Sequence, residues 1–134
     1  MKNFKLVLIW VLLLVMMVGT SSASAQGDVP DEIKTAIRNG SSNDLARYFN
    51  NTVEIGLDGE KSSYSKTQAE FVLKNFFSKN APVGFEFDHQ GSSNQGQRYA
   101  IGTYNSKAGP YRVFVVVKQA NGSYLIDTID FTKK

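Results

Sequence analysis

Four segments with the two-residue periodicity of β-strands follow one another between residues 83 and 131, and they restrict the fold more than any other feature. The predicted strands span residues 83–90, 97–105, 111–119 and 123–131. Short polar links join them, and Asn121-Gly122 has the sequence of a type I′ hairpin turn. Because links this short connect antiparallel neighbours, the sequence predicts an antiparallel sheet. The third segment is apolar on both faces, which predicts a central strand covered on both sides.

The segments before this tract predict two helices, a β-hairpin and a third, longer helix. Asp28 is a candidate cap for the first helix, which Gly40 is placed to end, and a short second helix follows through residue 49. Residues 52–57 and 60–64 flank Asp58-Gly59, a second two-residue hairpin turn. Ser65 and Gln68 form a capping box, which predicts a helix over residues 66–79.

The amino-terminal residues have the pattern of a secretory signal peptide. Lys2 and Lys5 precede an unbroken apolar run at residues 6–18, and the small residues that follow end in Ala23-Ser24-Ala25. We therefore predict cleavage between Ala25 and Gln26, so that residues 1–25 are removed and residues 26–134 form one exported domain. The apolar run is shorter than the roughly 20 residues that a membrane-spanning helix needs. We predict a periplasmic or extracellular protein with no membrane association after cleavage.

Charge and composition exclude several classes of function. The formal charge of +3 falls to +1 once Lys2 and Lys5 are removed, so the domain lacks the dense basic surface of a nucleic-acid-binding protein. The chain contains no cysteine, which excludes disulfides, thiolate zinc sites and cysteine nucleophiles. No motif for a metal or a cofactor is present, and we predict neither.

The order of the predicted elements resembles the cystatin-like α+β fold of the nuclear transport factor 2-like superfamily. In that fold a curved antiparallel sheet wraps around a long helix to form a cone. The sequence is also similar to a bacterial secreted family called domain of unknown function 4783. The similarity rests on residues 30–37, 48–54, 64–70, 76–80, 89–93, 99–103 and 111–113. The resemblance implies the fold α-α-β-β-α-β-β-β-β and an export route, and it implies no activity and no catalytic residues.

Two residues are candidates for catalysis, although no complete catalytic motif is present. His89, the only histidine, follows Val83, Phe85 and Phe87 in a series expected to face the inside of the cone. Its imidazole could serve there as an acid or base, or it could be a partly buried structural residue. Asp127 lies between apolar residues on the last strand, and a His89–Asp127 pair would be the simplest available dyad. If Asp127 faces outward, the dyad does not exist.

A ligand pocket is the second kind of candidate site. We predict that it would be lined by His89, Phe87, Tyr99, Tyr111 and Arg112, with tyrosine hydroxyls as hydrogen-bonding groups and Arg112 as a partner for an anion. The competing interpretation is ordinary packing for the tyrosines and a surface ion pair for Arg112.

Three functions are consistent with these patterns. The favoured one is a non-enzymatic exported module that binds a small molecule in the cone or an envelope protein through its sheet. The second is a small hydrolase, isomerase or dehydratase with His89 as the general base. The third is a structural envelope protein that assembles through the sheet. We also predict a possible homodimer through the doubly apolar strand, because an uncovered apolar face of that size is unusual on a monomer.

Overall fold

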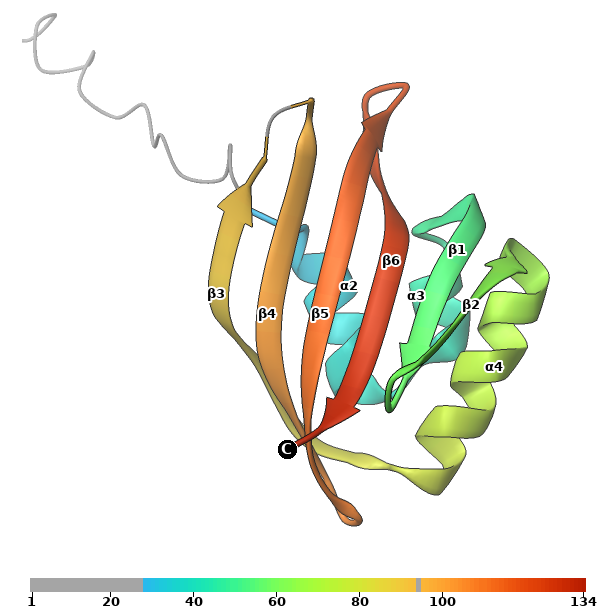
Figure 1. Cartoon of the computed structure of the whole chain (residues 1–134), viewed down its shortest axis with the longest axis vertical. Helices are drawn as coiled ribbons and strands as arrows, with labels where there is room; N and C mark the ends of the chain where they lie inside the picture. The colour runs from blue at the N-terminus through green and yellow to red at the C-terminus, as the bar shows by residue number, and fades with distance from the viewer. Residues whose placement is uncertain (1–27, 94) are drawn as a thin grey trace, which may run out of the picture.

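The computed structural model describes residues 28–93 and 95–134 of the chain. Two helices, a hairpin, a long helix and four strands follow one another in the predicted order (Figure 1). The elements are α2 (Asp31–Asn39), α3 (Ser42–Ala46), β1 (Phe49–Leu57), β2 (Glu60–Ser65), α4 (Lys66–Lys79), β3 (Pro82–Ser92), β4 (Gln97–Ser106), β5 (Gly109–Ala120) and β6 (Ser123–Lys133). Within the described ranges, no helix has the length and apolarity to cross a membrane.

Local signals in the sequence set the ends of the helices. The capping box at α4 is confirmed, since the Ser65 hydroxyl accepts the Gln68 N–H at 3.3 Å and the Gln68 side chain accepts the Ser65 N–H at 3.1 Å. Gly40 ends α2 in the left-handed region, with φ of 62°. The prediction that Asp28 caps α2 was wrong: the helix begins after Pro30, and no side chain accepts its first N–H groups.

The six strands form one curved sheet in the order β2-β1-β6-β5-β4-β3. All neighbours are antiparallel except β1 and β6, which run parallel. Strand β5 lies between β4 and β6, so the prediction that it is central in the sheet is confirmed, whereas only one of its faces is covered by described helices. Both hairpin turns are also confirmed, because positive φ occurs at Asp58 and Gly59 and at Asn121 and Gly122, as a type I′ turn requires.

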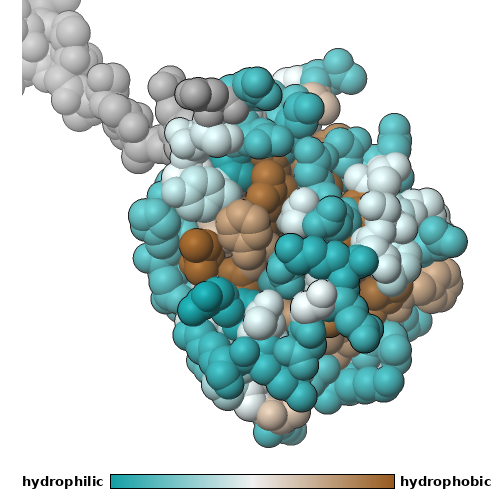
Figure 2. Space-filling view, in the orientation of Figure 1, coloured by the Kyte–Doolittle hydropathy of each residue, from teal (hydrophilic) through white to brown (hydrophobic). Residues whose placement is uncertain are grey.

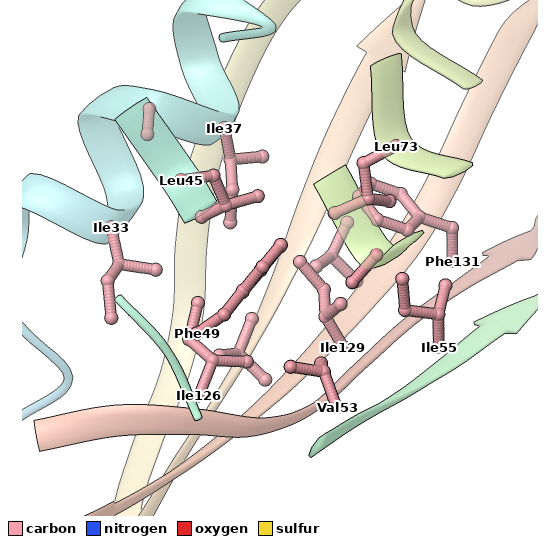
Figure 3. Packing of buried hydrophobic residues seen from close by; sticks show 14 of the residues in the cluster. Ile33, Ile37, Leu45, Phe49, Val53, Ile55, Leu73, Ile126, Ile129 and Phe131 are labelled. Atoms are coloured by element: carbon pink, nitrogen blue, oxygen red, sulfur yellow. The ribbon is translucent and has the colours of Figure 1, made fainter. Parts of the chain in front are cut away.

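The helices cover one face of the sheet, which we call the inner face; the opposite, outer face is turned toward the viewer in Figure 1. Apolar side chains from α2, α3 and α4 meet those of the inner face in a continuous core (Figure 3). The largest fully buried aliphatic side chains in it are Ile33, Ile37, Leu45, Ile55, Leu73, Ile126 and Ile129. Burial of this kind stabilises a fold by about 25 cal/mol per Å² of apolar surface. Because the chain has no cysteine, this core and not a disulfide holds the domain together.

One end of the cone is closed by aromatic rings. The centroid of Phe76 lies 4.4 Å from that of Phe131 and 5.3 Å from that of Tyr111. The hydroxyls of Tyr104 and Tyr111 donate to the backbone and side-chain oxygens of Asn80, the residue that ends α4. Burial, and secondarily the nearby Tyr111, raises the pKa of Tyr104 well above its usual range. These side chains fill the space that a ligand would occupy at this end.

Candidate functional site: the outer face of the sheet

His89 lies on the outer face, and the prediction that it ends an inward-facing series was wrong. In the pairing of β3 with β4, Phe87 lies opposite Gly102 and His89 lies opposite Ile101, which leaves Asp88 as an extra residue in β3. Because successive residues of a strand face opposite sides, this β-bulge moves His89 to the face away from the helices. Its side chain is exposed there, on an edge strand.

The structure does not bring His89 and Asp127 together. Strands β4 and β5 separate β3 from β6, so the strands that carry the two residues are about 14 Å apart at the usual strand spacing, and the residues themselves are at least that far apart. The Asp127 carboxylate instead accepts a hydrogen bond of 2.8 Å from the Asn50 side-chain amide. The nearest polar group to the His89 ring is the Tyr99 hydroxyl, 3.5 Å from Nε2. The predicted dyad is therefore absent.

The five residues predicted to line one pocket lie on two faces of the sheet. His89, Tyr99 and Arg112 belong to the outer face, whereas Phe87 and Tyr111 belong to the inner face. The Phe87 ring packs edge-on against Phe85 at 5.2 Å, and Tyr111 is buried in the closed end of the cone. No common pocket joins the two groups.

A cluster of apolar side chains occupies the middle of the outer face. Tyr99 and Ile101 of β4 lie opposite Val116 and Phe114 of β5, and the centroids of Tyr99 and Phe114 are 6.2 Å apart. These four residues, called the outer patch below, are half-buried, and no described helix covers them. Figure 2 shows apolar side chains gathered there with polar ones around them. The doubly apolar sequence of β5 indicated this surface, but the part played by β4 was missed.

Two depressions flank Phe114. One of 280 Å³ is bordered by Ile101, Arg112, Asp130 and Thr132. The other, of 190 Å³, is bordered by Tyr99, Val116 and the residues at the start of β4, with Ser93. Phe114 lines both. Phe114 is therefore the one residue that the two depressions share.

Charges of both signs surround the outer patch. Arg112 is exposed and forms no ion pair with any described residue. The Asp130 carboxylate lies 3.9 Å from the Lys61 ammonium and rests over Gly56, where a Cβ atom would approach it to 2.6 Å. Thr103 donates to Asp88 at 2.7 Å and accepts from the Lys134 ammonium at 2.9 Å. These groups can orient a partner electrostatically.

Within residues 28–93 and 95–134, no three His, Asp or Glu side chains converge as ligands of a metal ion would. The outer face thus carries a cluster of apolar side chains, a depression on each side of Phe114, and charged side chains of both signs around them.

Comparison with known proteins identifies the family. Residues 30–132 match the family model described as domain of unknown function (DUF4783). The chain belongs to this family. A DUF4783 protein from Bacteroides ovatus has a similar structure, with a TM-score of 0.76, 31% sequence identity, and coverage of 79% of this chain and 96% of that one. No protein with a curated description matches.

More distant structures share the fold alone. A domain of unknown function with a cystatin-like fold from Nostoc punctiforme aligns with a TM-score of 0.61 and 14% identity, covering 78% of this chain and 72% of that one. A protein with NTF2 in its name aligns with a TM-score of 0.59 and 13% identity, covering 75% of this chain and 90% of that one. The resemblance drawn from the sequence, to DUF4783 and to the cystatin-like and nuclear transport factor 2-like fold, is confirmed.

Proposed function

We propose that this DUF4783 protein is an exported, non-enzymatic binding module, and that the outer face of its sheet binds protein, with a second copy of the chain as the partner. The observation that carries the proposal is the outer patch: four apolar side chains at the centre of a sheet face that no described helix covers. Exposed apolar clusters rimmed by polar residues mark interaction sites on soluble proteins.

The arrangement of charge favours self-association. Arg112, Lys118 and Lys61 lie on the same face as Glu54, Asp130 and Asp88. Because cations and anions are nearly balanced, two such faces do not repel each other. A two-fold axis through the patch would make the same surface of each copy contact the other, so Arg112 of one copy and Asp130 of the other would lie in one interface. Contacts of this kind, in which one patch meets itself, are the usual basis of homodimers.

The other functions considered have less support. The Tyr104 and Tyr111 rings fill the closed end of the cone, where an apolar ligand would have been expected. An enzyme using His89 as its general base lacks a carboxylate to orient the imidazole, since no Asp or Glu of the described residues forms an ion pair with it and its bonded neighbour is the Tyr99 hydroxyl. Export rests on the signal-peptide pattern of residues 1–25, which lie outside the described residues.

Light scattering coupled to size-exclusion chromatography tests the proposal. We expect the exported protein to have the mass of a dimer at micromolar concentration, and Phe114→Lys to convert it into a folded monomer, because a charge would be buried at the centre of the contact. Phe71→Lys is the matched control, since Phe71 is 66% exposed on α4 and lies outside the patch. If the wild-type protein has the mass of one chain at about 100 µM, the proposed dimer is refuted. Equal effects of Phe114→Lys and Phe71→Lys on the mass would also refute it.

A further inference from the structure

The larger of the two depressions beside Phe114 carries opposite charges that are not paired with each other. It has a volume of 280 Å³ and is bordered by Ile101, Arg112, Phe114, Asp130 and Thr132. Arg112 lies opposite Thr132 and Phe114 lies opposite Asp130, so the two charged residues are diagonal neighbours on β5 and β6. Among the ion pairs of the described residues, none joins the Arg112 guanidinium to the Asp130 carboxylate.

The Asp130 carboxylate has acceptor positions to spare. Its side chain is 18% exposed, and its two contacts are long, at 3.9 Å to the Lys61 ammonium and 3.4 Å from the Thr132 hydroxyl. A strong bond from a hydroxyl to an oxygen is about 2.7–2.8 Å long, and an ionised carboxylate accepts about four hydrogen bonds. Gly56 leaves the space in which the carboxylate lies, since a Cβ atom there would approach Oδ1 to 2.6 Å. Asp130 can therefore bind a further cation at the depression.

Arg112 is the unpaired cation of the same depression. Its side chain is exposed, and no carboxylate of the described residues forms an ion pair with it. A guanidinium binds a carboxylate through two parallel N–H···O bonds, so the best partner for Arg112 is a planar carboxylate. Ile101 and Phe114, both half-buried, add apolar surface beside the charges.

The spacing and the size of the depression restrict the ligand. Diagonal neighbours on adjacent strands are about 7–8 Å apart, which leaves room for a small group with a charge at each end between Arg112 and Asp130. Because the two protein charges cancel, a zwitterion matches the depression better than a simple anion or cation. A volume of 280 Å³ lies just below the range of about 300–1,000 Å³ for pockets that hold drug-sized ligands, which indicates a smaller molecule.

We propose that this depression binds a free α-amino acid with an apolar side chain. Arg112 binds the carboxylate of the ligand, Asp130 binds its ammonium group, and Ile101 and Phe114 contact its side chain. The site goes beyond the pairing proposed for the outer face. It shares Ile101 and Phe114 with the outer patch, so an amino acid and a second copy of the chain compete for this surface.

The test is a titration of the ¹⁵N-labelled exported protein with leucine. We expect saturable shifts of the amide resonances of residues 101, 112, 114, 130 and 132. Two derivatives each lack one charge of the ligand: leucinamide has no carboxylate, and N-acetyl-leucine has no ammonium group. We expect both to bind about tenfold or more weakly than leucine, because hydrogen bonds to charged groups are the strong ones. Glycine, which has no apolar side chain, should also bind more weakly.

Variants assign each charge of the ligand to its partner. Arg112→Gln should weaken leucine binding about tenfold or more and abolish the preference for leucine over leucinamide. Asp130→Asn should instead abolish the preference for leucine over N-acetyl-leucine. Lys118→Gln is the matched control, since Lys118 is an exposed cation on β5 outside the depression, and it should leave leucine binding unchanged. If a variant does not fold, the ligand series on the wild-type protein still decides.

The outcomes separate this site from the proposed pairing. The site is overturned if about 20 mM leucine, well above a millimolar Kd, gives no saturable shifts, or if both derivatives bind as tightly as leucine. An equal loss of binding in Lys118→Gln and Arg112→Gln would also overturn it. A monomeric protein that binds leucine would refute the pairing and support the site. A dimer that is unaffected by leucine would refute the site and leave the pairing standing.

Discussion

At the scale of single residues, Tyr104 joins the sheet to the end of α4. Its hydroxyl, buried among aromatic rings, donates to the backbone oxygen of Asn80. Replacing Tyr104 with Phe leaves that oxygen without this donor, and we expect a loss of about 1–3 kcal/mol in the free energy of unfolding. Tyr64→Phe is the control, because Tyr64 is half-buried and its hydroxyl has no partner among the described residues. Urea denaturation measures both. Equal losses would show that the bond to Asn80 contributes nothing.

The same hydroxyl makes stability depend on alkaline pH. Burial raises the pKa of Tyr104 above that of an unfolded tyrosine, so the folded state favours the neutral phenol. The corresponding stability is complete below about pH 10 and is lost as the pH rises toward the folded-state pKa. We expect the urea midpoint of the wild type to fall between about pH 9 and pH 11, and Tyr104→Phe to show a smaller decline over the same range. Parallel declines in both proteins would contradict this assignment.

The candidate site was harder to predict from the sequence than the core. The alternation of Phe85 and Phe87 identified inward-facing residues correctly, yet the bulge at Asp88 reversed the expected face of His89. One extra residue in a strand has no clear mark in a single sequence. The inward position of Arg98 was not predicted either, because its bond to Tyr124 depends on strands that are paired only in three dimensions.

At the scale of elements, the contact between β3 and β4 requires a glycine at one position. A Cβ atom at Gly102 would approach the Glu86 carbonyl oxygen to 2.5 Å and the Phe85 ring to 2.9 Å. Since the nearest neighbour is backbone, relief would require the strands to separate, and we expect Gly102→Ala to cost about 1–3 kcal/mol. Gly84→Ala is the matched control, with nothing within 4 Å of its Cβ position. It should leave stability unchanged or raise it slightly. Thermal unfolding of the two variants compares them, and similar losses would refute the argument.

Elements with strong local signals were predicted well. The capping box of α4 and the two type I′ turns depend on residues next to one another in the chain, so their bounds followed from sequence. The parallel pairing of β1 with β6 depends instead on contacts between distant segments. Neither the pairing nor the irregular register between Phe49 and Glu54 has a local signature.

At the scale of the whole molecule, the two faces of the sheet differ in what covers them. The inner face packs against the helices over most of its area, and the partly buried Arg98 lies on it near the start of β4. The outer face has no described covering element and carries the outer patch. A partner that covers the outer patch would therefore leave the contacts between the sheet and the helices intact.

Export is the property of the whole chain that the proposed function requires, and cleavage after Ala25 tests it. We expect the protein recovered outside the cytoplasm of a bacterial host to begin at Gln26 by intact mass, because signal peptidases require small residues at the positions that Ala23 and Ala25 occupy. Ala25→Leu should block processing and retain residues 1–25. Ser24→Leu is the matched control, since the middle position of the motif is not restricted to small residues, and it should be processed normally. An unprocessed wild-type chain in the cytoplasm would refute the proposed localisation.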